Sequence, residues 1–455
     1  MRTLLPGYRQ VMAAFTGSTP APTRTLHAFD DLFGGPARIR AGTAGGLSLL
    51  VLDAPHLFDR DGGPYNDRDG RDWPDNPQRF AALGRAAQAI ARGALGAWRP
   101  DLVHSHDWQA GWTQAYLAYD GGPHIPSVFT VHNLAFQGWC DASLLGPLGL
   151  PPESFTVDGV EFYGGISPLK AGLRLADRIT TVSPTYADEI MRPADGQGLD
   201  GLLRARSADL SGIANGIDTN EWDPATDPLL PARFSGPAAR RRGRNKAALQ
   251  QRLGLRPDPD ALLFGIVSRL TGQKGIDLVL EALPELLSVG ANLAIVGSGD
   301  AALEQAVREA AARHPGRVGI HIGYDEALAR LIQAGSDAIL VPSRFEPCGL
   351  VQLCALRYGA IPVVSRVGGL ADTVIDANPA AQAAGVATGV QFLPVDGGGL
   401  AIAIRRTAAL WGDQTAWLRL QRNAMRSDVG WSAAAAAYSR IFLTLLGNQI
   451  SNKGV

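Results

Sequence analysis

The sequence predicts an α/β protein with two domains, each built around a doubly wound parallel sheet. Short apolar segments alternate with segments of helical periodicity along both halves of the chain. This alternation is typical of parallel strands joined by crossover helices. The length of 455 residues is enough for two or three domains with cores of their own. A proline-rich segment with a run of arginines separates the two halves and indicates an interdomain linker.

The first domain is expected to span residues 1–220. Its predicted strands lie at residues 47–52, 101–105, 127–131 and 178–182. A loop rich in Gly, Asp and Pro covers residues 59–75, and helical periodicity covers residues 79–98. Ser183 before Pro184 predicts the start of another helix, because serine is a favoured N-cap.

The second domain is expected to span residues 246–430, after a linker at residues 221–245. The arginine run at 240–242 in this linker is interpreted as a solvated face. Strands are predicted at residues 261–267, 292–296, 318–322, 338–341 and 361–364. A last helix is predicted at residues 431–446, within a C-terminal segment that covers residues 431–455.

Composition excludes several classes of protein. A net charge of −1 predicts no surface for nucleic acids or anionic membranes. The three cysteines, Cys140, Cys348 and Cys354, favour a reducing cytoplasm over a disulfide framework. The apolar start at Leu4 and Leu5 is too short for a signal peptide, and no apolar run approaches a membrane span. We therefore expect a soluble, cytoplasmic protein.

Two motifs at strand ends carry the chemistry of the second domain. The segment 267–275 contains the cations Arg269 and Lys274, and the segment 341–350 contains Glu346 followed by Pro347 and Gly349. Ligands of open α/β sheets bind at the carboxyl ends of strands. Cations suit a phosphate, and an acid beside a helix start suits a sugar. The pair of motifs therefore indicates a nucleotide-sugar enzyme.

Each motif has a plainer interpretation. The two cations could be exposed residues at a helix start, although the helix dipole disfavours cations there. Glu346 could be an ordinary loop acid, but a second turn at Gly368 and Gly369 again opens a helix after a strand. Gly297 and Gly299 match a loose dinucleotide-binding turn. They lie on the second predicted strand of their domain, so we expect a tight turn instead.

The strand ends of the first domain carry histidines and a carboxylate. His104 and His106 share a strand face, which makes a metal site conceivable, but no third ligand is placed convincingly. A buried polar network is the favoured interpretation of His104. Asp107 and the pair His132–Asn133 follow neighbouring strands and are expected to line a cleft.

The combination of motifs resembles the bacterial glycogen synthases, the ADP-glucose-dependent family shared with plant starch synthases. The matching stretches cover nearly the whole chain. They are Leu4-Leu5-Pro6-Gly7-Tyr8, Pro64-Tyr65-Asn66-Asp67, Asp72-Trp73-Pro74-Asp75-Asn76, His104-Ser105-His106-Asp107-Trp108-Gln109-Ala110-Gly111, Thr130-Val131-His132-Asn133-Leu134-Ala135-Phe136-Gln137-Gly138, Lys170-Ala171-Gly172-Leu173, Val182-Ser183-Pro184-Thr185-Tyr186-Ala187, Asn215-Gly216-Ile217-Asp218, the two motifs above, and residues 368–374.

The resemblance implies two Rossmann-like domains facing across a cleft, the GT-B arrangement, with a C-terminal helix that crosses back to the first domain. It implies a retaining transfer of glucose from ADP-glucose to the non-reducing end of an α-1,4-glucan such as glycogen. No metal or other cofactor is implied, and neither nucleic acid nor membrane is an expected partner.

The resemblance also assigns roles to particular residues. Arg269 and Lys274 would neutralise the departing diphosphate, and Glu346 would orient the glucose. Asp107 and His132 would approach the sugar from the first domain. The residues expected to support the site, contact the adenine or line the donor pocket are Asn133, Asn215, Gln273, Tyr324, Ser343, Cys348, Gly349 and Leu350.

One motif of the family has no counterpart at its usual place. The family begins with a strand and Lys-x-Gly-Gly-Leu, whereas here Leu4 and Leu5 match a later strand. We therefore expect the first strand–helix unit to be missing, which leaves open a non-catalytic, glucan-binding protein. Another donor is a further alternative, although Cys354 stands where many related transferases carry a second glutamate.

Overall fold

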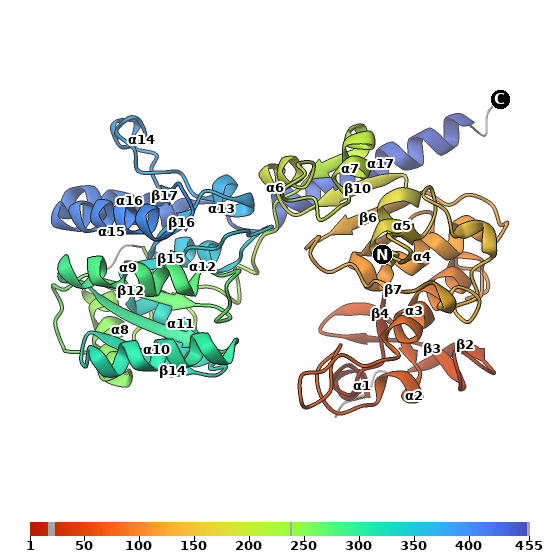
Figure 1. Ribbon diagram of the computed structural model, residues 1–455, viewed down its shortest axis with the longest axis horizontal. Helices are drawn as coiled ribbons and strands as arrows, with labels where there is room; N and C mark the ends of the chain where they lie inside the picture. Colours follow the sequence, from red (N-terminus) through yellow and green to blue (C-terminus); the bar gives the residue numbers. More distant parts are fainter. Residues whose placement is uncertain (17–22, 237–238, 453–455) are drawn as a thin grey trace. The chain divides into compact units, whose positions relative to one another are not determined.

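The computed structural model describes residues 1–16, 23–236 and 239–452 of the chain (Figure 1). The chain divides into two compact units. Unit 1 comprises Met1–Thr181, Ile190–Ser211 and Ser439–Val455, and unit 2 comprises Val182–Glu189 and Gly212–Tyr438. Each unit contains parallel strands with helices packed against them, which confirms the predicted α/β fold class.

Unit 2 contains a six-stranded, fully parallel sheet in the order β14-β13-β12-β15-β16-β17. The strands predicted at 318–322 and 338–341 occur at those residues, whereas β12 begins two residues later than expected and β17 was not predicted. The strands are β12 (Leu263–Val267), β13 (Asn292–Gly297), β14 (Val318–Ile322), β15 (Ala338–Val341), β16 (Ile361–Ser365) and β17 (Val390–Phe392).

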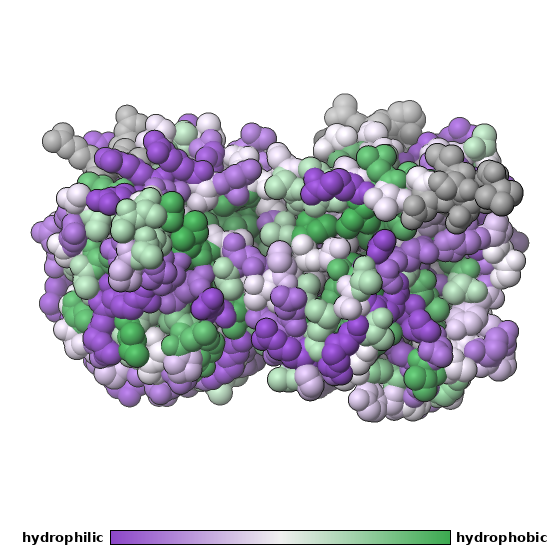
Figure 2. All heavy atoms as spheres, turned by 90° about the horizontal axis from the view of Figure 1, so that it is seen from above, coloured by the Kyte–Doolittle hydropathy of each residue, from purple (hydrophilic) through white to green (hydrophobic). Residues whose placement is uncertain are grey.

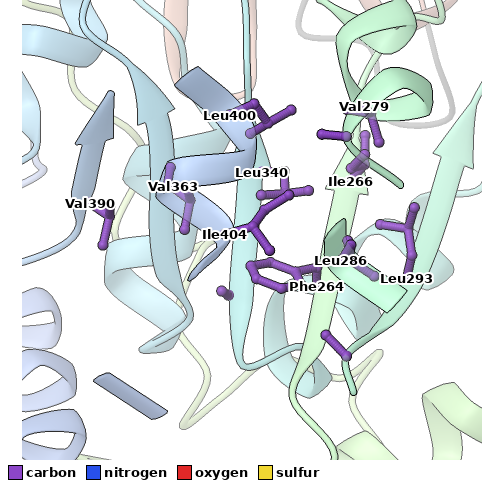
Figure 3. Packing of buried hydrophobic residues seen from close by; sticks show 14 of the residues in the cluster. Phe264, Ile266, Val279, Leu286, Leu293, Leu340, Val363, Val390, Leu400 and Ile404 are labelled. Carbon is purple, nitrogen blue, oxygen red and sulfur yellow. The ribbon is translucent and has the colours of Figure 1, made fainter. Parts of the chain in front are cut away.

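Helices cover both faces of this sheet, as a doubly wound fold requires. The helices of unit 2 are α6 (Pro184–Glu189), α8 (Ala239–Arg252), α9 (Ile276–Ser288), α10 (Ala301–Arg313), α11 (Glu326–Gly335), α12 (Val351–Tyr358), α13 (Gly368–Thr373), α14 (Pro379–Ala384), α15 (Gly397–Gly412) and α16 (Gln414–Arg426). One core packs Leu286 of α9 and Ile404 of α15 against Phe264 of β12 (Figure 3). A second core packs Leu249 of α8 and Leu331 of α11 with strand residues of the sheet. Burial of these apolar faces, worth about 25 cal/mol per Å², holds the strand ends in fixed positions.

Unit 1 contains two four-stranded sheets and a small three-stranded one. The sheet β11-β10-β6-β5 includes the strands predicted at 101–105, 127–131 and 178–182, which pair in parallel, whereas the strand predicted at 47–52 lies in the other sheet as β4. In the other sheet β1 pairs in parallel with β4, while β3 pairs antiparallel with both neighbours. The strands are β1 (Thr3–Pro6), β2 (Arg24–Phe29), β3 (Ala37–Ala44), β4 (Leu47–Asp53), β5 (Val103–His106), β6 (Ser127–Val131), β10 (Arg178–Thr181), β11 (Leu210–Gly212) and the short β7 (Cys140–Asp141), β8 (Glu161–Phe162) and β9 (Gly165–Ile166).

The helices of unit 1 differ from the sequence prediction mainly at their ends. The helix expected at 79–98 runs from Asn76 to Ala91, because Gly93 and Gly96 adopt positive φ values of 98° and 78° after it. The last helix, α17, extends to Asn452, and residues 453–455 of the predicted segment lie outside the described residues. The other helices are α1 (Arg9–Thr16), α2 (Pro55–Phe58), α3 (Asn76–Ala91), α4 (Asp107–Tyr119), α5 (Pro168–Leu175), α7 (Asp200–Ala205) and α17 (Ser432–Asn452).

The segment predicted as a linker packs inside unit 2 where the structure describes it. The Asp227 carboxylate is buried, accepts a hydrogen bond of 2.5 Å from the Tyr358 hydroxyl and pairs with Arg330. Arg242 is also buried, and its guanidinium donates to the backbone carbonyls of Tyr358 and Ser336. The solvated interpretation is therefore wrong for Arg242. Residues 237–238 of the predicted linker lie outside the described residues.

Hydrophilic and hydrophobic side chains are mixed over the face shown in Figure 2. Within the described ranges, no helix has both the length and the apolar character needed to cross a bilayer.

Candidate active site

The two motifs of unit 2 lie side by side at one edge of its sheet. Strand β12 ends at Val267 and β15 ends at Val341, and the two strands are parallel neighbours. The loops that follow are joined by the Gln273 carbonyl, which accepts a hydrogen bond of 2.9 Å from the Arg344 amide. The Gln273 side chain donates to the Phe345 carbonyl at 3.3 Å. The motifs that are separated in sequence therefore form one continuous surface.

Lys274 and Glu346 form an ion pair within this surface. Lys274 Nζ lies 2.5 Å from Glu346 Oε2, and the side chains are 19% and 9% exposed. The buried Ser343 hydroxyl donates to the same oxygen at 2.9 Å. Glu346 Oε1 has no hydrogen-bond partner among the described residues, so it is available to a ligand.

A small cavity of about 50 Å³ lies at this ion pair. Its lining includes Ser268, Lys274, Ser343, Glu346 and Gly349. This volume is too small for a nucleotide sugar. A ligand of that size would continue over exposed surface.

Three predicted site residues of unit 2 lie on exposed surface. Tyr324 is 88% exposed and Leu350 is 50% exposed. The Arg269 side chain is exposed and has no ion pair with any other described residue. A cation with no protein partner is free to bind an anion.

The Gly297–Gly299 turn braces the loop that carries Arg269. Leu270 donates its amide to the Ser298 carbonyl at 2.9 Å, and its own carbonyl accepts from the Asp300 amide at 2.8 Å. A Cβ added at Gly297 would lie 1.8 Å from the Ser268 carbonyl oxygen. Glycine is therefore required at this position for close approach of two backbones.

The second Gly-Gly turn packs against the backbone of Glu346. Gly369 donates its amide to the Glu346 carbonyl at 3.0 Å. Gly368 has a φ of +40°, and a Cβ there would lie 2.1 Å from the same carbonyl oxygen. This turn follows β16, the parallel neighbour of β15, so it lies at the same sheet edge as the loop that carries Glu346. The Gly368–Gly369 turn fixes the position of the Glu346 backbone through the hydrogen bond from Gly369.

Cys348 is a packing residue of this edge. Burial, the largest effect, raises the pKa of its thiol to about 11, and a hydrogen bond with Asn215 only partly opposes this. The thiol is therefore neutral near pH 7 and poorly nucleophilic. Through this interaction Asn215, predicted as a supporting residue, contacts the loop that carries Glu346 and Cys348.

In unit 1, Asp107 and His132 are joined at the ends of neighbouring strands. Asp107 begins α4 directly after β5, and His132 follows β6. Asp107 Oδ1 accepts a hydrogen bond of 2.7 Å from the His132 amide. Burial raises the pKa of the Asp107 carboxyl, and the neighbouring His132 opposes that shift. Asn133 Oδ1 caps the following turn by accepting from the Ala135 amide at 3.0 Å.

His104 belongs to a polar network, which is the interpretation favoured from the sequence. Its Nε2 lies 2.6 Å from the Thr130 hydroxyl, which in turn lies 2.6 Å from the Thr180 hydroxyl. The part of the chain that the structure describes contains no group of three His, Cys, Asp or Glu side chains placed to hold a metal ion.

Sequence reasoning gave no role to Tyr65, although it lies in one of the quoted motifs. Its ring centroid is 6.2 Å from that of Trp108, and burial and then the Asp107 charge raise the pKa of its hydroxyl. In the same loop at 59–75, Asp59 and Asp61 form ion pairs with Arg9. Both carboxylates of this loop segment are thus occupied by an arginine.

The predicted site residues form two groups, one on each unit. Unit 1 carries Asp107, His132 and Asn133, and the remaining residues lie on unit 2. Apart from Asn215, which contacts Cys348, the residues of each group follow the carboxyl ends of parallel strands, which is where open α/β sheets bind ligands.

The chain is similar to several known proteins along nearly its whole length. The family described as "Starch synthase catalytic domain" matches residues 1–205, and "Glycosyl transferases group 1" matches residues 249–392. A glycogen synthase of Rhodopseudomonas palustris (strain BisA53) is 59% identical over 98% of this chain and 90% of its own length. A glycogen synthase of Acidiphilium cryptum (strain JF-5) is 58% identical over 98% of this chain and 92% of its own length.

Solved structures show the same similarity. The catalytic domain of starch synthase IV from Arabidopsis thaliana, bound to ADP and acarbose, has a TM-score of 0.84 and 31% identity. The match covers 98% of this chain and 92% of that one. A sucrose-phosphate synthase from Thermosynechococcus elongatus shares the fold, with a TM-score of 0.56 at 19% identity.

Proposed function

The chain belongs to the glycogen synthase family, and from this premise we propose that it transfers glucose from ADP-glucose to the non-reducing end of an α-1,4-glucan, with retention of configuration. It is a glycosyltransferase of the GT-B fold. Glycogen is the proposed acceptor and the cytoplasm the proposed location, in keeping with three free cysteines.

The observation that supports this function best is the arrangement of Arg269, Lys274 and Glu346 at one sheet edge. In the transfer, the bond between glucose C1 and a diphosphate oxygen breaks while C1 bonds to the acceptor oxygen, and the proton of the acceptor hydroxyl passes to the departing diphosphate. Negative charge develops on the departing ADP. Arg269 and Lys274 supply positive charge there without reorganisation, which stabilises the transition state.

Glu346 is proposed to orient the transferred glucose. Its Oε2 is held by Lys274 and Ser343, which leaves Oε1 to accept hydrogen bonds from sugar hydroxyls. A carboxylate with both position and charge fixed can hold the sugar in one reactive orientation. Gln273 links the two donor loops, and Gly349 and Leu350 border the sugar. Tyr324 is proposed to contact the adenine.

The residues of unit 1 are proposed to form the acceptor side. Asp107, His132 and Asn133 offer hydrogen-bonding groups suited to sugar hydroxyls. We propose residues 1–220 as the acceptor-side domain and residues 246–430 as the donor-side domain. Within the first range, Val182–Glu189 and the residues from Gly212 onward pack with unit 2.

The direct test is ADP release from ADP-glucose in the presence of glycogen. We expect ADP release that depends on glycogen. We also expect the α-1,4-linked chains of the glycogen, measured after debranching, to be longer than before the reaction. A parallel assay with UDP-glucose measures the donor preference. Glycogen binding without release of ADP from ADP-glucose or of UDP from UDP-glucose would contradict the proposal and favour a non-catalytic glucan-binding protein.

A further inference from the structure

Three imidazole rings form a row at the carboxyl ends of β5 and β6. The ring centroids of His104 and His106 are 4.2 Å apart, and those of His106 and His132 are 5.2 Å apart. His104 and His106 share a face of β5, because side chains alternate along a strand. We propose that His106 is a positioning residue, which fixes the tautomer and the ring orientation of His132.

The contact that carries this inference joins His106 Nδ1 and His132 Nε2, which are 3.0 Å apart. A hydrogen bond of this length holds one proton, so one nitrogen donates and the other accepts. A neutral imidazole carries its single proton on one of its two nitrogens. If His106 accepts, both rings carry the proton on Nε2. If it donates, both carry it on Nδ1. The tautomer of one ring therefore dictates that of the other.

His106 is held in place from the opposite side by His104. The Nε2 atom of His104 is bonded to Thr130 on β6, and Thr130 is bonded to Thr180 on β10. The row of rings is thus tied to three adjacent strands of one sheet. Desolvation, the largest effect, and the neighbouring histidines lower the pKa of His104 to about 3 and that of His106 to about 4, although part of His106 is exposed to solvent. Both shifts favour the neutral imidazole near pH 7.

The backbone between β5 and α4 supplies the second anchor. Asp107, the residue after His106, adopts a φ of +53°, in the left-handed region that favours glycine over residues with a side chain. In this conformation its carboxylate accepts from the His132 amide at 2.7 Å. Two consecutive residues therefore bind the same histidine, one at its ring and the other at its backbone.

A fixed tautomer has a direct consequence for sugar binding. The His132 ring presents the same type of nitrogen, a donor or an acceptor, to a hydroxyl group at every turnover. This step depends on the proposed function because it takes a sugar as the ligand. The tautomer coupling itself does not depend on the reaction.

The first experiment measures ring ¹⁵N chemical shifts in the full chain with labelled histidine. We expect His106 and His132 to show the same dominant tautomer. In His106→Phe the stacked ring is kept and the nitrogen is lost, so His132 should shift to a mixture of tautomers. Opposite tautomers in the unaltered protein, or unchanged His132 shifts in His106→Phe, would overturn the proposal whether or not the protein is active.

The second experiment separates positioning from a merely structural role by steady-state kinetics. We expect His106→Phe to lower kcat about tenfold, the value of roughly one hydrogen bond, with both KM values within about twofold. His106→Asn places an amide where Nδ1 lies and should keep most of the activity. His124→Asn, at an exposed histidine that pairs with Asp177, is the control and should match the unaltered protein.

The effect must also disappear when His132 is absent. In a His132→Ala background, His106→Phe should cause no further loss of kcat, since its effect acts through the missing ring. Losses that multiply would show that His106 acts independently of His132 and would contradict the proposal. Equal thermal unfolding midpoints of the His106 variants confirm that both are folded.

Discussion

Lys274 Nζ lies 2.5 Å from Glu346 Oε2, in a pair that joins the ends of neighbouring parallel strands. The two side chains are 72 residues apart in sequence and both are largely withdrawn from water. Each charge therefore lowers the free-energy cost of withdrawing the other from water. Removing one partner leaves the other poorly solvated and unpaired, whereas removing both charges does not.

Lys274→Ala is expected to destabilise the protein by about 3 kcal/mol, because it leaves the Glu346 carboxylate unpaired. Adding Glu346→Gln should recover most of this loss, since a neutral amide needs no counter-charge. Urea unfolding of the two single variants and the double variant measures the coupling. Strictly additive changes in the free energy of unfolding would contradict the structural dependence between the two side chains.

Arg269→Ala is expected to lower kcat/KM for ADP-glucose about 100-fold, because a cation facing developing negative charge is lost. Arg269→Lys should recover part of the activity, since it restores the charge without the two-pronged hydrogen bonding. Arg308→Ala, at an exposed arginine of α10, is the matched control. A similar loss in the control variant would contradict a specific role for Arg269.

Gly368→Ala is expected to lower both stability and activity. The new Cβ would lie 2.1 Å from the Glu346 carbonyl oxygen and would push Glu346 out of place. Gly385→Ala is a matched control, because Gly385 also has a positive φ, of +72°, with open space around it. The control should cost about 1 kcal/mol of stability and leave kcat unchanged. Equal effects in the two variants would exclude the steric explanation.

The lowered pKa of His104 predicts that the free energy of unfolding decreases as the pH falls from about 7 to 5. Burial lowers the pKa of the His104 imidazole in the folded protein from 6.5 to about 3. At a pH between these two pKa values, His104 is protonated in the unfolded chain and neutral in the folded protein. The stabilising contribution is complete above pH 6.5 and is lost as the pH falls, by about 2 kcal/mol at pH 5. His104→Gln keeps a polar atom near Thr130 but cannot titrate. Urea unfolding at both pH values should show a smaller decrease for the variant, and equal decreases would contradict the prediction.

The order of elements was readable from the sequence because it is a local property. Fully buried parallel strands appear as short apolar runs between helices, and strands such as Val318–Ile322 and Ser127–Val131 were predicted at their observed residues. The antiparallel strands β2 and β3 were missed. Strand β3, Ala37–Ala44, mixes buried and exposed positions without the continuous apolar run of a buried strand.

Charged residues show the limit of local reasoning. Arg242 stands in a polar run of sequence, yet the fold buries it and satisfies its guanidinium with two carbonyls, one of Ser336 and one of Tyr358. Its burial depends on partners about a hundred residues away, which no window of sequence contains. The same reason explains why the contact of Tyr65 with Trp108 was not predicted.

The sequence by itself determined the fold class, the family resemblance and the identity of the residues that carry charge and hydrogen-bonding groups. Strand periodicity, glycine turns and the spacing of the motifs are all encoded within short segments. Only the tertiary structure decided which of these residues meet. The pairing of Lys274 with Glu346, and that of His106 with His132, follow from the register of adjacent parallel strands. That register is set by packing of whole sheets and helices, so the contacts between side chains exist only once the chain has folded.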